Sequence, residues 1–269
     1  MIVLSVRACR VKLTWSATFA AYALTTGTFV LPAGRVGDLY GHKNLLVGAY
    51  VWFSISSLIT GLSVYSKSFV FYSVCRGLQG LACAVLVPCA LAILGTVYKD
   101  GPRKNLVFGF FAAGSPIGFT IGSVFSALLA QLAWWPWMYY LTAIMCCLFS
   151  LLSYFVIPDV PSHGDESSEK KSESKLGGYK NFDWLGSLTG VAGLVLFNVA
   201  WNRAPAVGWQ AADVLTTFIS GLALFVAFVY IEHKAAYPLI PMRDMSKDAA
   251  LVLIVTPLGW SSFGEHDSG

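Results

Sequence analysis

Arg76 and Gln79 are the residues whose types and spacing best suit chemistry inside a membrane. They stand three positions apart in the apolar run Phe69–Gly95, so on a helix their side chains share one face. A charge in apolar surroundings costs several kcal/mol, and the arginine is expected to face a bundle interior or a polar cavity. The alternative is an arginine that snorkels to the nearby outer interface. Gly77 and Gly80 would let a neighbouring helix pack closely beside this pair.

A glycine-rich, charged stretch, residues 34–43, separates the first two apolar runs. We expect a tight turn here, in which the glycines supply positive φ and close backbone approach. Its bases would hold the turn on the cytoplasmic face, and its acid would lie within reach of a neighbouring helix end. The residues are Gly34, Arg35, Gly37, Asp38, Gly41 and Lys43.

Glycines recur every four residues in the run Leu106–Leu132, at Gly114, Gly118 and Gly122. This spacing predicts one smooth ridge along a helix for close contact with a neighbour. Pro116 removes one backbone hydrogen bond and is expected to kink that helix where its neighbours compensate. A pure packing role is the alternative, because ridges of small residues are common in membrane bundles.

The elements that must position these residues are membrane-spanning helices. Hydrophobic residues make up 56% of the chain and charged residues 12%, and the mean hydropathy is +0.65, unlike a soluble domain. The apolar runs are long enough to span a bilayer and lack the alternation of barrel strands. We predict seven complete spans and part of an eighth: Thr14–Ala33, Leu45–Val64, Phe69–Gly95, Leu106–Leu132, Trp137–Ile157, Trp184–Trp201 and Val214–Ile231, then Ala249–Phe263.

Lysine and arginine are distributed unevenly between the loops. Twelve of them follow the first, third, fifth and seventh spans, and only Lys67 and Arg203 lie in the intervening loops. The positive-inside rule places the first set in the cytoplasm. The segment Met1–Lys12 carries three bases on the opposite side, and Ala249–Phe263 is too short to cross the hydrocarbon core. We therefore expect an interior fragment of a longer protein.

This organisation divides the chain into three segments. Residues 1–157 are expected to form an N-terminal transmembrane bundle, and residues 183–269 the following, truncated transmembrane helices. Residues 158–182 are rich in Ser, Glu and Lys and cannot bury enough surface to order themselves, so we expect a cytoplasmic linker. Asp183 precedes the next apolar run and is expected to cap its helix.

Other classes of function fit this composition poorly. The four histidines lie in loops or the tail without metal-type spacing, and the six cysteines show no paired spacing, so no metal site is expected. A membrane enzyme is a remote alternative, because no nucleophile motif or phosphate loop stands out. The bases occupy short loops, so no nucleic-acid partner is expected. The expected partners are the lipid bilayer and a small-molecule substrate, and the oligomeric state is open.

These motifs resemble, in the same order, those of the major facilitator superfamily. The glycine-and-charge stretch resembles its signature loop between helices two and three, with His42 in place of the usual arginine. The stretch Arg76-Gly77-Leu78-Gln79-Gly80 resembles the fourth-helix motif of proton-coupled members. The glycines around Pro116 resemble the fifth-helix motif of antiporters, with Ser115 where a glycine is usual.

The resemblance implies an all-α integral membrane fold, a major facilitator-type helical bundle. It is nearest to the fungal fourteen-helix drug:proton antiporter group. The visible spans would be helices two to eight and the start of nine, lacking the first helix and most of the C-terminal bundle. The implied roles are proton coupling at Arg76 and Gln79, cytoplasmic gating at Gly34, Gly37, Asp38, Gly41 and Lys43, and a helix-five hinge at Gly114, Pro116, Gly118 and Gly122.

The implied function is that of a proton-coupled secondary transporter. It would export drugs, toxins or other small organic molecules by alternating access, across the plasma membrane, with a proton gradient and no cofactor. The alternative is a transport-inactive truncated relic, or a gene-model fragment, of such a transporter.

Overall fold

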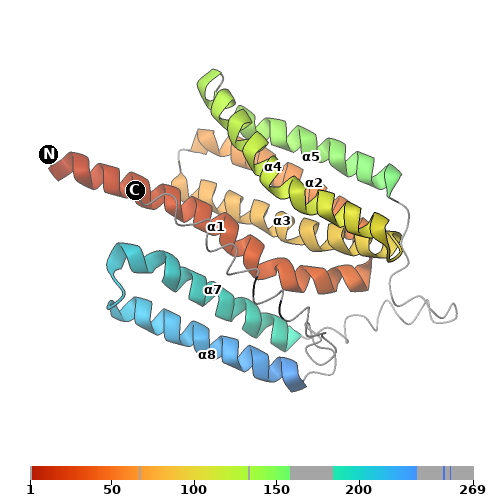
Figure 1. Cartoon of the computed structure of the whole chain (residues 1–269). Coiled ribbons are helices and arrows are strands. Elements are labelled where there is room, and N and C mark those ends of the chain that lie inside the picture. The colour runs from red at the N-terminus through yellow and green to blue at the C-terminus, as the bar shows by residue number, and fades with distance from the viewer. Residues whose placement is uncertain are drawn as a thin grey trace.

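The chain folds into long helices that lie alongside one another (Figure 1). The computed structural model describes residues 2–66, 68–132, 134–157, 184–234, 251 and 255, with side chains from residue 20 onward except residue 206. Within these ranges no strand occurs, and the predicted all-α fold is confirmed. The helices are α1 (Ile2–Tyr40), α2 (His42–Leu62), η1 (Ser63–Ser66), α3 (Phe69–Val97), α4 (Pro102–Leu132), α5 (Trp137–Val156), α7 (Trp184–Val207) and α8 (Ala212–Lys234).

Six helices in the described part of the chain are long and apolar enough to cross a membrane. They correspond to the second to seventh predicted spans and are His42–Ser66, Phe69–Val97, Pro102–Leu132, Trp137–Val156, Trp184–Pro205 and Ala212–Lys234. The first predicted span, Thr14–Ala33, lies within α1, which is not among the six. Of the predicted partial span only residues 251 and 255 are described, and the 158–182 segment and Asp183 lie outside the described residues.

The connections between helices follow from residues that begin or break a helix. Ser68 caps α3, where its hydroxyl accepts a hydrogen bond from the Phe71 N–H at 3.4 Å. Pro102 is the first residue of α4, a position at which its missing N–H leaves no partner unsatisfied. Gly208, with φ of 98°, turns the chain between α7 and α8. Short turns of this kind reverse the direction of successive helices.

The helices pack as two groups joined through α1. α1 lies along α3, and α2 lies against both α3 and α5. α7 and α8 form a hairpin that contacts the other helices through α1 (Figure 1). Among the described helices, α4 makes slight contact with α3 and α5 and has no buried residue. A core of Leu46, Cys89 and Ile93 lies between α2 and α3.

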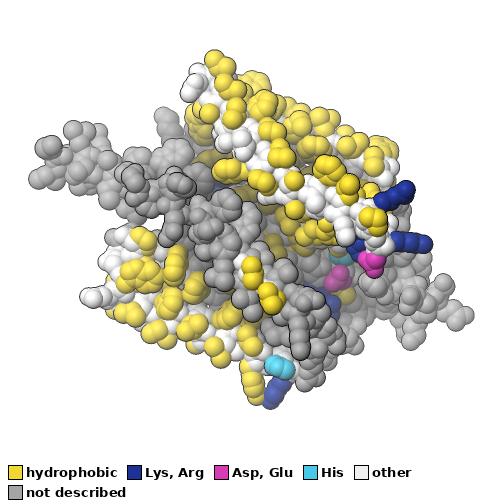
Figure 2. Space-filling view, in the orientation of Figure 1, with side chains coloured by type: hydrophobic (Ala, Val, Ile, Leu, Met, Phe, Trp, Pro, Cys, Tyr) yellow, Lys and Arg dark blue, Asp and Glu magenta, His cyan; other side chains and the backbone are white. Residues whose placement is uncertain are grey.

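Large apolar side chains are exposed over much of the described part of the surface (Figure 2). Phe119 on α4 and Phe155 on α5 are both 79% exposed, which would be costly in water and is favourable against lipid. Several of the dark blue Lys and Arg side chains in Figure 2 lie at the end of the molecule where α4 begins, and another lies at the bottom of the view beside a cyan His side chain. The end where α4 begins is the one that the charge distribution predicts to face the cytoplasm.

Candidate functional site

A line of hydrogen bonds joins three polar side chains in the interior of the bundle. Arg76 Nη1 donates to Gln79 Oε1 at 2.9 Å, and Gln79 Nε2 donates to Ser57 Oγ at 2.8 Å. Gln79 is 1% exposed and Ser57 is fully buried, so this line crosses from α3 to α2 away from lipid. The predicted shared face of Arg76 and Gln79 is thus present, and the arginine points inward rather than snorkelling to the interface.

Two tyrosine rings flank the arginine. The guanidinium carbon of Arg76 lies 4.9 Å from the centre of the Tyr22 ring on α1 and 5.9 Å from that of Tyr139 on α5. Such cation–π contacts stabilise a desolvated cation by about 2 kcal/mol. The Tyr139 hydroxyl is hydrogen-bonded to the Tyr72 hydroxyl, and the Trp135 ring meets both tyrosines edge-on. The arginine therefore sits where α1, α3 and α5 meet.

Gly80 brings α1 close enough for this arrangement. A Cβ at Gly80 would lie 2.1 Å from Thr25 Oγ1 and 2.5 Å from the Tyr22 carbonyl oxygen. Thr26 Oγ1 also donates across the contact to the Gly80 carbonyl at 3.1 Å. The expected close packing is found at Gly80, whereas a Cβ at Gly77 would make only ordinary contact with Thr25, at 3.7 Å. Gly80 thus sets the distance between Tyr22 and Arg76.

The charge of Arg76 is not matched by an acid within the described residues. None of the ion pairs found there includes Arg76, and its Nε is buried without a hydrogen-bond partner. A buried donor left in this state costs about 1–3 kcal/mol. The guanidinium is a cation that carries donors only, so it can attract an anion and hydrogen-bond to it.

The α1–α2 corner, residues 34–43, differs from the predicted loop. α1 continues through Tyr40 and α2 begins at His42, so Gly34 and Gly37 are helical. The expectation that all three glycines supply positive φ is wrong, because only Gly41 has it, at 91°. One such residue is enough to break the helix, and the Gly41 N–H still bonds to the Gly37 carbonyl at 2.9 Å.

Side chains at this corner form an ion-paired cluster. Asp38 Oδ1 lies 3.2 Å from His42 Nε2, and Asp38 Oδ2 lies 3.8 Å from Arg35 Nη1. The bare backbone of Gly37 makes room for the imidazole, because a Cβ there would meet His42 Nδ1 at 2.5 Å. Lys43 Nζ lies over the Tyr154 ring at 5.7 Å and ties the corner to α5. Asp38 is thus held within its own corner.

Asp100 and Lys104 form a second ion pair at the same end of the molecule. Asp100 lies just before α4, and Lys104 lies in its first turn. Lys104 Nζ donates a hydrogen bond to Asp100 Oδ1 at 2.8 Å. This hydrogen bond lowers the pKa of the Asp100 carboxyl, and the positive charge of Lys104 adds to the effect. The carboxyl is exposed, so the pair orders the start of α4 only weakly.

The predicted glycine ridge of α4 makes no close helix contact in the described part of the chain. No atom outside the helix lies within 4 Å of a Cβ placed at Gly114, Gly118 or Gly122. The expectation of close packing there is therefore wrong for the described helices, because α4 lies against its neighbours without burying any face. Around Pro116, the Thr120 hydroxyl donates to the proline carbonyl at 2.9 Å. The hinge role of Pro116 and the three glycines stays a prediction.

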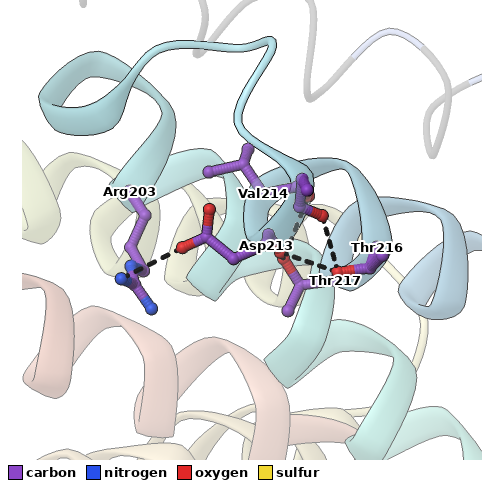
Figure 3. A network of polar contacts seen from close by, with 6 residues as sticks. Arg203, Asp213, Val214, Thr216 and Thr217 are labelled. Atoms are coloured by element: carbon purple, nitrogen blue, oxygen red, sulfur yellow. Dashed lines mark hydrogen bonds and ion pairs between the residues drawn. The ribbon is translucent and has the colours of Figure 1, made fainter.

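The α7–α8 hairpin carries a polar and aromatic cluster that the sequence analysis missed. Arg203 Nη2 lies 3.2 Å from Asp213 Oδ2 across the turn, and Thr216 and Thr217 donate to the Asp213 carbonyl (Figure 3). Trp201 and Trp209 meet edge-on with ring centres 5.3 Å apart. Tryptophan and arginine together are typical of a membrane interface, and the charge rule predicts the outer interface for this turn.

A small cavity lies where the hairpin meets α1. It holds about 30 Å³ and is lined by Thr28 and Pro32 of α1, Ser187 and Gly190 of α7 and Phe228 of α8. This volume suffices for one or two water molecules but not for an organic substrate. Within the described ranges, no cluster of His, Cys, Asp and Glu side chains could hold a metal ion. Among the described residues, the Arg76 site is the place where a cation is joined by hydrogen bonds to two buried polar side chains, Gln79 and Ser57.

The sequence indicates two residues of this site, Arg76 and Gln79. It does not indicate the other three, which are Ser57, Tyr22 and Tyr139. Ser57 lies in an apolar run with other small polar residues, and nothing in that run distinguishes it. The two tyrosines stand among many aromatics. Their approach to Arg76 depends on how three helices are rotated against one another, which the spacing within one helix does not encode.

Comparisons with known proteins agree with a transporter fold. The model of the Major Facilitator Superfamily matches residues 12–264. Over 253 residues the chain is 47% identical to a low affinity ammonium transporter of Saccharomyces cerevisiae, a match that covers 94% of this chain and 47% of the yeast protein. It is 40% identical over 245 residues to an efflux pump of Aspergillus terreus, covering 91% of this chain and 46% of the pump.

A multidrug transporter of Aspergillus fumigatus is 38% identical over 224 residues, which are 83% of this chain and 40% of that protein. The chain thus spans about half the length, or less, of the relatives it matches. The matched family and these relatives are transporters, so the remote alternative of a membrane enzyme is set aside.

Proposed function

Because the chain belongs to the major facilitator superfamily, we propose that the protein is a proton-coupled exporter of small organic molecules. The observation that carries this proposal is the buried line from Arg76 through Gln79 to Ser57. Ionisable residues at membrane depth are expensive and face functional pathways. The relatives described as an efflux pump and a multidrug transporter support the direction of transport and the kind of cargo.

In this proposal Arg76 influences the proton without carrying it. Its guanidinium is a cation with donors only, so it acts by favouring the anionic form of the group that lies beside it. Gln79 and Ser57 hold the guanidinium in place, because each hydrogen bond in the line restricts the next side chain. The proton itself would be carried by a titratable group outside the described residues that lies beside Arg76, and competition between its protonation and binding of the transported molecule would be the basis of antiport.

The α1–α2 corner would act as the cytoplasmic latch. Asp38, His42 and Arg35 form a cluster whose contacts can be made or broken as two helical bundles rock around a midplane site. The residues Gly114, Pro116, Gly118 and Gly122 would supply the hinge in α4. The plasma membrane is the proposed location.

Everted membrane vesicles from cells expressing the complete gene test the proposal. A panel of fluorescent cationic, neutral and anionic aromatic compounds should include at least one that accumulates when a proton gradient is imposed. A protonophore should abolish that accumulation, and Arg76→Gln should reduce it about tenfold or more, as expected for loss of a charged hydrogen-bonding group. Accumulation that persists without a gradient, or at full rate in Arg76→Gln, contradicts the proposal.

Transport of ammonium is a second candidate, favoured by the 47% identity to the yeast ammonium transporter. The buried guanidinium argues against it, because a fixed positive charge repels a small cation at the same site. Uptake of labelled methylammonium by cells expressing the gene distinguishes the two. Saturable uptake that Arg76→Gln leaves intact would favour the ammonium candidate over the exporter.

A further inference from the structure

Within the described residues, no hydrogen-bond acceptor is found for the Nε of the Arg76 guanidinium. Among the hydrogen bonds of the described residues, Arg76 makes one, from Nη1 to Gln79. Its Nε is buried and has no partner. Arginine presents its donors in a rigid planar fork, and the Nε–Nη2 edge of that fork matches the two oxygens of a carboxylate. The structure therefore contains a cation and a pair of donors for which the described chain provides no acceptor.

The described acids are all engaged or positioned elsewhere. Asp38 pairs with His42 at the end of α1, and Asp100 pairs with Lys104 at the start of α4. Asp213 pairs with Arg203 in the α7–α8 turn, and Glu232 lies in the last turn of α8. Each of these positions is at or beyond a helix end, whereas Arg76 lies inside α3. No described carboxylate is placed to neutralise it.

The surroundings of this edge favour a flat, aromatic ligand. Tyr22 and Tyr139 lie against the guanidinium from α1 and α5, and Trp135 and Tyr72 extend the aromatic surface beyond Tyr139. A planar ring next to the guanidinium can stack on or meet these rings edge-on. Among the described side chains that surround Arg76, no second one carries a positive charge. A ligand with a single negative charge therefore matches the charge of this site.

We infer that Arg76 binds the carboxylate of an aromatic acid, which is the substrate class of this transporter. The acid's two oxygens accept hydrogen bonds from Nε and Nη2, and its ring lies against Tyr22 and Tyr139. Gln79 keeps Nη1 occupied, so the free edge of the fork points in a fixed direction. This inference rests on the proposed function for its role in transport, but binding at this site needs no proton gradient.

The test is calorimetric titration of the complete protein, purified in detergent, with naphthoate and with its neutral analogue naphthalenemethanol. We expect naphthoate to bind about tenfold or more tightly than the alcohol, the ratio for one charge-assisted pair. Arg76→Gln should abolish this preference, and Arg76→Lys should restore part of it. Arg203→Gln, which removes an exposed arginine in the α7–α8 turn, is the matched control and should leave the preference unchanged.

A second pair of variants keeps the test decisive if Arg76→Gln does not yield folded protein. Tyr22→Phe retains the ring and should bind naphthoate as before, whereas Tyr22→Leu should weaken binding several-fold. If the unmodified protein binds naphthoate and naphthalenemethanol equally, the inference is overturned. It is also overturned if Arg76→Gln and Tyr22→Leu both still prefer naphthoate as the unmodified protein does. Proton-driven export of other compounds together with no naphthoate preference would leave the proposed function standing and remove this inference alone.

Discussion

Gly37 illustrates how a single residue controls the α1–α2 corner. A methyl group there would meet the His42 imidazole at 2.5 Å, so Gly37→Ala must displace the ring from Asp38. We predict a loss of about 1–3 kcal/mol of stability, the usual cost of overpacking, measured by thermal unfolding of the purified protein. The same substitution made together with His42→Ala should cost much less, because the clash is gone. Equal losses in both backgrounds would show that the contact is not made.

The Arg76 site shows what residue spacing can and cannot predict. The i, i+3 spacing of Arg76 and Gln79 predicts one shared helix face, and their hydrogen bond follows from it. Tyr22 and Tyr139 reach the same guanidinium from α1 and α5. Their positions depend on the register between helices that are apolar all round, so the sequence carries no local signal for them.

Gln79 is the residue that links the arginine to α2, and its replacement tests the role of the line. We predict that Gln79→Leu weakens proton-driven transport several-fold while leaving protein in the membrane, since a buried leucine is tolerated but cannot orient Arg76. Gln79→Glu should lower proton-driven transport further than Gln79→Leu does, because a carboxylate at position 79 would itself neutralise the guanidinium. The readout is the vesicle assay, normalised to protein amount. Unchanged transport in both variants would contradict a positioning role for Gln79.

At the scale of helices, the α7–α8 hairpin depends on close backbone contact. A Cβ at Gly221 of α8 would lie 2.8 Å from the Phe197 backbone N of α7. We predict that Gly221→Ala lowers stability by about 1–3 kcal/mol, because a backbone atom cannot move aside as a side chain can. Gly48→Ala on α2 is the matched control, since nothing lies within 4 Å of its Cβ position, and should be neutral or stabilising by about 0.5–1 kcal/mol. Similar thermal shifts in the two variants would contradict this packing.

The helices themselves were predictable, and the errors concern glycine. Continuous apolar runs predicted where helices lie, because a bilayer accepts few other structures. The structure adds the helix bounds at Ser68, Pro102 and Gly208. Gly34 and Gly37 were assigned to a loop but are helical, and of the two only Gly37 serves a close approach, because a Cβ at Gly34 would make ordinary contact with Pro88 at 3.7 Å. The glycine ridge of α4 would allow another helix to pack closely against it, but no described helix does so. Glycine spacing therefore indicates what a helix allows, and not which neighbour it meets.

For the whole molecule, the charge distribution predicts an orientation. The α3–α4 connection, with Lys99, should face the cytoplasm, and the α7–α8 turn, with Gln210, should face outward. Cysteines introduced by Lys99→Cys and Gln210→Cys should therefore react with a membrane-impermeant maleimide from opposite sides, above the background of the native cysteines. Labelling of both from the same side of intact cells would contradict the assigned topology.

Proton flux during transport is the decisive measurement for the molecule as a whole. Proteoliposomes will contain the complete protein and an internal pH-sensitive dye. Their interior should become more alkaline when a transported compound from the vesicle panel is added outside, because an antiporter exchanges internal protons for the compound. We predict that the unmodified protein moves protons in the direction opposite to the compound, and that Arg76→Gln loses this coupling. Compound movement with no proton flux, or full coupling in Arg76→Gln, would contradict a proton-coupled transporter built around Arg76.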